Sequence, residues 1–270
     1  MKILLNNDDL NEALNNVSNL GFVPTMGSLH KGHISLIKKS KKKSNKTLVS
    51  IFINPKQFNN KKDFRLYPRN NKKDLSILKK LNVDFVYLPS EKDIYNLKRK
   101  KKIKLNKKDK ILCANYRKRH FEGVIDVMDR LTNIINPNYI FMGEKDFQQL
   151  YLVKNFIEKK YKSKIISCKT IRNNNKLALS SRNLLLKKDQ LINAEKLSQN
   201  LISFKKKLNR VKNIKKLLQN KKEQLNKIYN VNIEYLELRN IINLKKTNNI
   251  KYSKLFIAYY LDKVRLIDNF

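Results

Sequence analysis

The sequence predicts an α/β protein in which a parallel-sheet domain precedes a smaller α+β domain. Short apolar runs alternate with amphipathic segments through the first 168 residues, an alternation typical of parallel α/β sheets. Beyond that region helical periodicity occupies roughly 188–229, and strand-like runs follow it. A chain of 270 residues can form one large domain or two smaller ones. We therefore expect domains over 1–168 and 169–270.

The first domain is predicted to begin with a helix that leads into a buried strand. Leu10, Leu14 and Val17 recur at helical spacing, and an apolar run follows them. In chain order the prediction is a helix over 8–20, a strand over 21–26, a helix to about 45, a strand over 47–53, a helix near 72–81, a strand over 83–88, a helix to about 135, a strand over 139–142, a helix over 147–159 and a strand over 164–168.

The second domain is predicted to begin after a polar loop over 172–183. Helices within 188–229 precede strands over 231–238, 255–260 and 264–267. Neither glycine nor proline occurs after Gly143. Because asparagine tolerates left-handed backbone better than most residues, we expect the turns of this domain to form at asparagines.

The chain is strongly basic, with 61 lysines and arginines against 22 acidic residues and a net charge of +39. Such an excess is typical of proteins that bind nucleic acid or anionic membranes. Here the lysines are spread along the sequence and interleaved with asparagine, which favours a general compositional bias over a dedicated patch. We interpret the lysine-rich stretch 98–110 as a solvated loop and expect no specific nucleic-acid partner. The charge would still attract ATP and other anions.

The two cysteines, Cys113 and Cys168, have neither metal-binding nor redox spacing, which indicates a reduced environment. The first residues lack the apolar core of a signal peptide, and no stretch has the length and apolarity of a membrane span. We therefore expect a cytoplasmic protein without a membrane partner.

The stretch 21–33 (GFVPTMGSLHKGH) is the most informative segment of the sequence. It predicts a buried strand, a turn and the first turn of a helix, with His30 and His33 on one face of the helix N-terminus. Free N–H groups at a helix N-terminus bind anions, and two imidazoles there can hold phosphate oxygens. Gly32 leaves room for a ligand to approach the backbone. We interpret this stretch as a nucleotide triphosphate site.

Two further loops follow predicted parallel strands and belong at the same sheet edge. The loop over 54–58 (NPKQF) follows one strand, and the turn over 143–146 (GEKD) follows another. Open α/β sheets bind ligands outside the carboxyl ends of their strands. We therefore expect all three loops to contribute to one site.

Four blocks of the sequence together resemble the pantothenate synthetase (pantoate–β-alanine ligase) family of HxGH nucleotidyltransferases. They are 24–33 (PTMGSLHKGH), 52–58 (FINPKQF), 143–149 (GEKDFQQ) and 177–183 (LALSSRN), and they occur in the family's order. Segments 67–69, 120–124 and 265–269 match as well. The resemblance implies a Rossmann-like nucleotidyltransferase domain with a smaller C-terminal α+β lid domain.

The same resemblance implies an ATP-dependent ligase. Pantoate would react with ATP to give pantoyl adenylate and pyrophosphate, and β-alanine would then displace AMP to give pantothenate. It further implies a homodimer formed through the first domain. Mg²⁺ would accompany ATP, held mostly by phosphate oxygens and water, with Asp74 and Asp146 as acidic candidates and no protein-built metal site.

The resemblance also assigns roles to residues. His33 would be the proton donor, His30 and Lys145 would face the triphosphate, and Ser180, Ser181 and Arg182 would form a mobile loop that excludes water. Gln57 and Gln149 would hold pantoate. The residues expected to contact the nucleotide are Met26, Gly27, Ser28, Leu29, His30, Lys31, Gly32, His33, Gly143, Glu144, Lys145, Asp146, Ile171, Leu179, Ser180, Ser181 and Arg182.

The sequence departs from the family pattern in the loop before the serines. An acidic residue followed by Asp-Gly is usual there, whereas this chain has Asn173, Asn175 and Lys176. The loop loses negative charge and a flexible glycine, which puts its closure in question.

Two other functions fit parts of the sequence. Another HxGH nucleotidyltransferase or a synthetase-like protein acting on an RNA would explain the histidines and the charge, but not the 54–58 loop or the Gln148–Gln149 pair. A non-catalytic nucleic-acid-binding protein would need clustered arginines and exposed aromatics, and here the lysines are scattered and the aromatics lie mostly in strand patterns.

Overall fold

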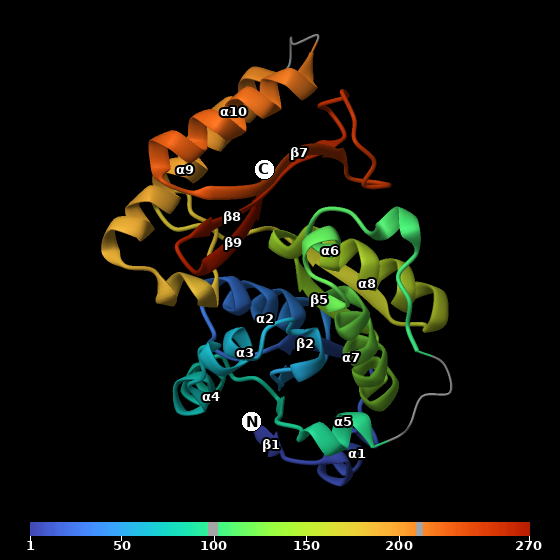
Figure 1. Ribbon diagram of the computed structural model, residues 1–270. Coiled ribbons are helices and arrows are strands. Elements are labelled where there is room, and N and C mark those ends of the chain that lie inside the picture. Colours follow the sequence, from blue (N-terminus) through green and yellow to red (C-terminus); the bar gives the residue numbers. More distant parts are fainter. Residues whose placement is uncertain (97–101, 209–212) are drawn as a thin grey trace. The chain divides into compact units, whose positions relative to one another are not determined.

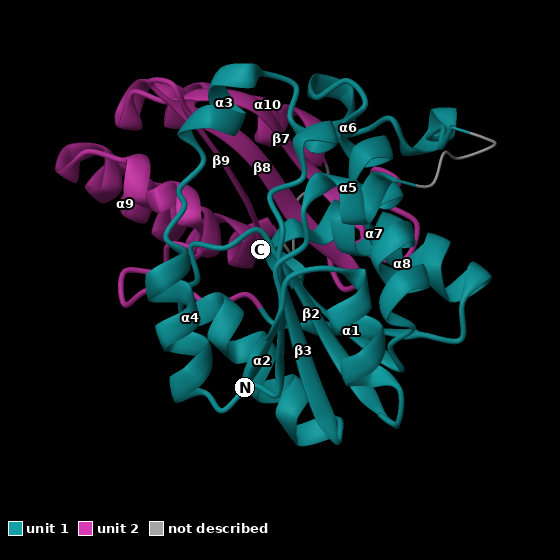
Figure 2. Ribbon diagram, turned by 90° about the horizontal axis from the view of Figure 1, so that it is seen from below, with its two compact units in different colours: residues 1–169 teal, residues 170–270 magenta. Residues whose placement is uncertain are grey.

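Two compact units make up the chain, over Met1–Lys169 and Thr170–Phe270 (Figure 2). The computed structural model describes residues 1–96, 102–208 and 213–270. Part of the predicted 98–110 loop and part of the predicted 188–229 helical region therefore lie outside the described residues. None of the described helices is long and apolar enough to cross a membrane.

Unit 1 contains a six-stranded parallel sheet with the order β1-β4-β3-β2-β5-β6, which confirms the predicted α/β class. Figure 1 labels three of these strands, β1, β2 and β5. Its elements are β1 (Lys2–Leu4), α1 (Asn7–Leu14), β2 (Leu20–Thr25), α2 (Lys31–Lys43), β3 (Lys46–Ile51), η1 (Pro55–Gln57), α3 (Lys61–Leu66), α4 (Asn71–Lys80), β4 (Phe85–Tyr87), α5 (Glu91–Tyr95), η2 (Lys107–Asp109), α6 (Cys113–Tyr116), α7 (His120–Ile135), β5 (Tyr139–Gly143), η3 (Glu144–Asp146), α8 (Phe147–Lys160) and β6 (Lys164–Cys168).

Both faces of this sheet are buried, which explains why its strands are apolar at consecutive positions. Val23 and Val49 pack with Ile37 of α2 and Leu78 of α4 on one face. Successive strand residues point to opposite faces, so the adjacent Phe22, which is fully buried, faces the other layer.

Several element boundaries differ from the prediction. The first helix ends at Leu14 rather than near residue 20: a turn follows in which Val17 N–H donates to the carbonyl of Leu14, and Asn19 has left-handed backbone (φ 53°) directly before β2. The edge strand β1 and the short helices α3 and α5 were not predicted. Three to six residues carry too little periodicity to reveal an element.

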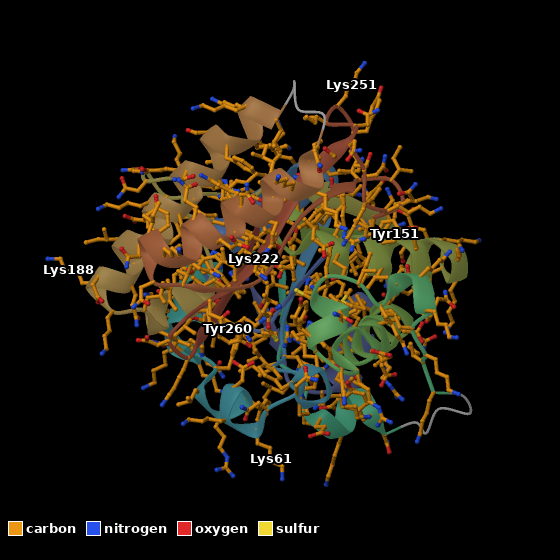
Figure 3. All side chains as sticks on the ribbon, turned by 45° about the horizontal axis from the view of Figure 1, so that its top comes forward. Lys61, Tyr151, Lys188, Lys222, Lys251 and Tyr260 are labelled. Atoms are coloured by element: carbon orange, nitrogen blue, oxygen red, sulfur yellow. The ribbon has the colours of Figure 1, made fainter. Side chains whose placement is uncertain are left out.

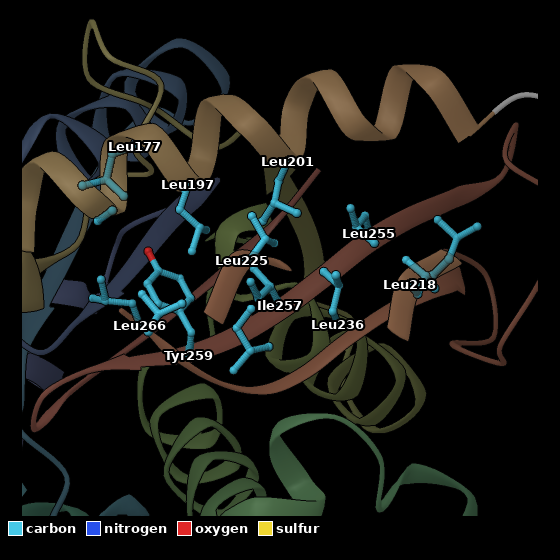
Figure 4. Packing of buried hydrophobic residues seen from close by; sticks show 14 of the residues in the cluster. Leu177, Leu197, Leu201, Leu218, Leu225, Leu236, Leu255, Ile257, Tyr259 and Leu266 are labelled. Carbon is cyan, nitrogen blue, oxygen red and sulfur yellow. The ribbon is translucent and has the colours of Figure 1, made fainter. Parts of the chain in front are cut away.

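Unit 2 is an α+β unit with a three-stranded antiparallel sheet in the order β7-β8-β9. Its elements are η4 (Ser181–Leu185), α9 (Lys188–Lys207), α10 (Ile214–Tyr229), β7 (Asn232–Asn240), β8 (Ser253–Leu261) and β9 (Val264–Asn269). Its core joins both helices to the sheet: Leu201 of α9 and Leu225 of α10 pack with Leu255 and Ile257 of β8 (Figure 4).

The turns of unit 2 form only in part at asparagine. Asn230 is left-handed as expected, but Lys176, Leu244 and Asp262 also adopt positive φ, between 49° and 73°. The backbone of these three residues stays in the left-handed region because the surrounding structure imposes that conformation.

Exposed basic side chains project from both units. Lys61 of unit 1, and Lys188 and Lys251 of unit 2, are exposed and point away from the chain (Figure 3). The positive charge is thus distributed over many elements.

The core of unit 2 generates a stability prediction. Leu201 is fully buried, so Leu201→Ala leaves a cavity and should lower the free energy of unfolding by about 2–5 kcal/mol. Leu184 is 73% exposed, and Leu184→Ala should change it by about 0.5 kcal/mol or less. Urea unfolding of both variants measures the difference, and equal midpoints would contradict this packing.

Candidate active site

The strand order brings three loops to one edge of the unit 1 sheet. β2 lies between β3 and β5, and all three strands are parallel. The segments that follow them are the histidine turn, η1 and η3. The chain continues from β2 to β3 on one side and later returns to β5 on the other, so this edge is a topological switch point, where open α/β sheets bind ligands.

The histidine turn is held from a distance by Asp74 of α4. This carboxylate is 1% exposed, and its two oxygens accept the backbone N–H groups of Ser28 and Leu29, both at 2.7 Å. Gly27 has φ 78°, and a Cβ there would lie 3.0 Å from Asp74 Oδ2. Glycine is therefore required by both conformation and space. With both oxygens occupied, Asp74 serves the turn and is a poor candidate for Mg²⁺.

His30 and His33 cap α2 reciprocally. His30 is the N-cap, and its Nδ1 accepts the N–H of Gly32 at 3.1 Å. His33 Nδ1 accepts the N–H of His30 at 3.3 Å, and the ring centroids are 4.1 Å apart. A nitrogen that accepts carries no proton, so each ring is neutral and has its hydrogen on Nε2. The pair therefore offers two Nε2–H donors.

The electrostatic environment keeps both rings neutral. Burial, and next the charge of Lys145, lower the pKa of His30 to about 4, while Asp146 opposes the shift. Burial, His30 and Lys145 lower the pKa of His33 to about 3. At neutral pH the imidazoles therefore act as hydrogen-bond donors without a positive charge of their own.

The expectation of free backbone N–H groups at this helix N-terminus is wrong for most of the turn. Gly27 N–H donates to Thr25 Oγ1, Ser28 and Leu29 donate to Asp74, and the next turn is capped by the histidines. An anion therefore meets imidazole N–H groups here rather than an open row of backbone donors.

Lys145 supplies the fixed positive charge beside this pair. It lies in η3, directly after β5, and its charge acts on both histidines. Asp146, the next residue, acts on His30. The structure thus brings the predicted turn over 143–146 to the predicted histidines, although these two segments lie far apart in the sequence.

The loop that carries Gln57 is organised by Asn54, a residue to which the sequence assigned no role. Asn54 is 1% exposed; its Oδ1 accepts from Tyr95 Oη at 2.7 Å, and its Nδ2 donates to the carbonyl of Gly123 at 3.1 Å. Nδ2 also donates to Gln57 Oε1 at 3.2 Å. Gln57 Nε2 consequently points towards the histidine turn and lies 2.8 Å from Met26 Sδ.

The third histidine of the chain holds the same loop. His120 Nδ1 donates to the carbonyl of Gln57 at 2.7 Å, and its Nε2 accepts from Arg117 at 2.9 Å. A Cβ on Gly123 would lie 2.3 Å from the carbonyl oxygen of Lys56, so α7 approaches this loop at a distance only glycine permits. The match over 120–124 marks this segment as a family feature in the sequence. It does not show that the segment contacts the loop carrying Gln57.

The two glutamines at the start of α8 have different environments. Gln148 is buried and donates to the carbonyl of Ile111 at 2.7 Å, which ties α8 to the chain before α6. Gln149, the predicted substrate-binding residue, is only partly buried in the first turn of the helix.

The remaining predicted site residues lie in unit 2. Ser180 caps η4, with its Oγ accepting the N–H of Arg182 at 3.3 Å, and Ser181 is buried. Ile171 and Leu179 are joined by a backbone hydrogen bond of 2.9 Å, from Leu179 N–H to Ile171 O. Within the described residues no three His, Cys, Asp or Glu side chains cluster as a metal site.

The Asp74 contacts predict that the histidine turn depends on both carboxylate oxygens. Asp74→Asn replaces one acceptor with an NH₂ group that faces a backbone N–H. We expect the free energy of unfolding to fall by about 1–3 kcal/mol and ATP to bind more weakly. Asp8→Asn, at an exposed position in the first turn of α1, should cost about 0.5 kcal/mol or less. Urea unfolding and calorimetric titration with ATP test this, and two variants of equal stability would disprove it.

The lowered histidine pKa values predict a specific pH dependence. The unfolded chain binds protons at these residues near pH 6.5, but the folded chain does so only near pH 4 and 3. The contribution of these histidines to the free energy of unfolding is therefore fully present above pH 6.5, and it is lost as the pH falls from there through about 4 for His30 and about 3 for His33.

Replacement of both histidines by asparagine isolates this effect. In the double variant with His30→Asn and His33→Asn, Oδ1 replaces each Nδ1 as the acceptor but cannot titrate. Urea midpoints at pH 7 and pH 5 should differ less for the double variant than for the wild type. The same pH dependence in both proteins would show that the histidines do not cause it.

Comparisons with known proteins agree on one family. The model of the pantoate-β-alanine ligase family matches residues 2–270. The pantothenate synthetase of Francisella tularensis subsp. novicida (strain U112) is 39% identical over 264 residues, covering 93% of this chain and 88% of that protein. Among solved structures, a pantothenate synthetase from Thermus thermophilus has a TM-score of 0.92 at 27% identity over 100% of this chain and 99% of that one. A pantoate-β-alanine ligase from Francisella tularensis, complexed with β-γ ATP and β-alanine, has a TM-score of 0.84 at 37% identity, covering 100% and 97% of the two chains.

Proposed function

We propose a residue-level mechanism for this chain, which belongs to the pantoate-β-alanine ligase family. Its reaction is the ATP-dependent condensation of pantoate with β-alanine to pantothenate, through pantoyl adenylate, with release of pyrophosphate and AMP. The observation that carries the mechanism is the neutral histidine pair beside Lys145, at the sheet edge that also holds Gln57.

In the first step a pantoate carboxylate oxygen attacks the α-phosphorus of ATP, and pyrophosphate leaves with the electrons of the broken P–O bond. Two anions must approach each other, so the site must stabilise negative charge. The Nε2–H groups of His30 and His33 donate to phosphate oxygens, and Lys145 adds a full positive charge. Neutral donors beside one lysine avoid the repulsion that three cations would create before ATP binds.

Gln57 and Gln149 hold pantoate in this mechanism. An amide can donate to a carboxylate without forming an ion pair, so the carboxylate keeps its nucleophilicity. Asn54 accounts for the orientation of Gln57, since its Nδ2 donates to Oε1 and so leaves Nε2 as the end of that amide that faces the histidine turn. Residues Met26 to His33 and Gly143 to Asp146 surround the triphosphate.

In the second step the β-alanine amine attacks the acyl carbon of the adenylate, AMP leaves, and the nitrogen loses a proton. The intermediate hydrolyses if water reaches it, so the site must close. Ser180, Ser181 and Arg182 contribute hydroxyl groups and a positive charge to that closure, with Ile171 and Leu179 beside the nucleotide. Unit 2 acts as the lid.

Mg²⁺ accompanies ATP, and it would neutralise phosphate charge. The donor set fits a cation bound mainly to phosphate oxygens and water, because both oxygens of Asp74 already accept backbone N–H groups. Asp146, whose charge acts on His30, is the acidic candidate that is left. We further propose that the protein is cytoplasmic and forms a homodimer through unit 1.

The reaction is tested with the purified protein, ATP, Mg²⁺, pantoate and β-alanine. AMP release should require both organic substrates, and omission of β-alanine should leave pantoyl adenylate bound to the protein. AMP formation that is independent of pantoate would rule the ligase out.

His33→Asn tests the donor role separately from folding. Asparagine keeps an acceptor for the His30 N–H but lacks a group at the Nε2 position. We expect kcat/KM for adenylate formation to fall by about 10²–10³-fold, the range for loss of one donor to developing charge. Circular dichroism and urea unfolding at pH 7 should match the wild type. Near-normal turnover would remove His33 from the chemistry.

A further inference from the structure

The segment before the serines is a β-hairpin within unit 2. Its two strands are joined by the Arg172–Ala178 bridge and by a hydrogen bond of 2.9 Å from Leu179 N–H to Ile171 O. At the tip, Lys176 adopts φ 73°. The second strand leads directly into Ser180, so the position of the hairpin sets where the serine–arginine segment begins.

The base of the hairpin is anchored to β9. Arg172 donates to both carboxylate oxygens of Asp268, at 2.7 and 2.8 Å, and Asp268 is buried. Arg172 also donates to the carbonyl of Lys176 at 2.9 Å and lies over the ring of Phe270. A bidentate guanidinium–carboxylate pair of this kind fixes orientation as well as distance.

The tip is anchored to α9 by Glu195 and Gln199. Glu195 Oε1 accepts from Asn173 Nδ2 at 2.6 Å, and Oε2 accepts from Asn175 Nδ2 at 2.8 Å. Gln199, one turn further along α9, donates to the carbonyl of Asn175 at 3.1 Å. The two asparagines on which the sequence departs from its family are thus the donors to Glu195, and the negative charge of this region resides on the helix.

These contacts extend to the serines. Asn173 also accepts the N–H of Leu177 through its Oδ1 at 2.9 Å, and Leu177 is buried in the unit 2 core. The next residue, Ala178, accepts from Asn183 Nδ2 at 3.1 Å, inside η4. A chain of packed and hydrogen-bonded groups therefore runs from Glu195 through the hairpin to both ends of the serine–arginine segment.

We propose that Glu195 is a positioning residue for the ligase reaction: it fixes the tip of the 171–179 hairpin and thereby the placement of Ser180, Ser181 and Arg182. The proposal rests on the proposed function, which assigns those three residues to the nucleotide. In this proposal Glu195 acts on the segment through Asn173 and Asn175.

Hydrogen exchange tests the structural half of the proposal without reference to activity. In Glu195→Gln one oxygen remains an acceptor, but the new NH₂ faces the NH₂ of an asparagine. Exchange of the peptide over 171–180 should accelerate by about tenfold, the effect of losing roughly one charge-assisted hydrogen bond in a local opening. Glu223→Gln removes an exposed carboxylate from α10 and should leave that peptide unchanged.

Kinetics test the functional half. With Glu195→Gln the KM for ATP should rise by about fivefold, whereas the KM for pantoate should stay within about twofold, because only the serine–arginine segment is displaced. Faster exchange with an unchanged KM for ATP would overturn the positioning role. A wild-type protein without ligase activity would instead remove the proposed function.

Reversal of the hydrogen bond gives the sharpest test. Asn173→Asp alone places two carboxylates against each other and should impair exchange protection and the KM for ATP. When this change is combined with Glu195→Gln, the glutamine amide donates to the new carboxylate on the hairpin and still accepts from Asn175. Both readouts should then return to within about twofold of the wild type. Impairment in the double variant that equals the product of the single effects would overturn the proposal.

Discussion

The site depends most directly on the hydrogen bonds between the buried carboxylate of Asp74, on α4, and the backbone of the histidine turn. The carboxylate accepts two backbone N–H groups in a turn where Gly27 and Ser28 both have positive φ. An internal anion of this kind stabilises a strained turn and at the same time occupies donors that a phosphate could otherwise use. A ligand anion must therefore be bound mainly by side-chain donors.

The histidine pair meets this need through its tautomeric state. Because each Nδ1 caps the helix, each Nε2–H is directed by the backbone and is not free to rotate to another acceptor. Protonation would place a charge in a buried position beside Lys145; burial first, and the neighbouring positive charges next, lower the pKa of both histidines. Lys145 already supplies positive charge beside the pair, so what the neutral histidines add is directed hydrogen-bond donors.

Polar groups outside the functional positions organise three of the predicted functional loops. Asp74 holds the histidine turn, Asn54 and His120 hold Gln57, and Glu195 holds the hairpin before Ser180. In each case the organising group comes from another element or from the loop's own buried base. In the histidine turn it also satisfies the backbone N–H of the buried Leu29, which would otherwise lack a partner. Such loops are preorganised, which limits the entropy lost when a ligand binds.

The sequence alone determined the parallel α/β class, the residue types of the site and the family, because apolar strands, a histidine pair at helical spacing and four ordered blocks are local signals. It also placed Gln57 and Lys145 in loops at the carboxyl edge of the sheet.

The sequence could not reveal the residues that hold these loops. They are Asp74 for the histidine turn, Asn54 and His120 for Gln57, and Glu195 for two asparagines of the hairpin. These roles depend on contacts across 20 to 69 residues of chain, and a sequence pattern carries no distance between elements. Only the tertiary structure decided that the histidines are neutral, since their protonation follows from which backbone N–H groups their Nδ1 atoms accept.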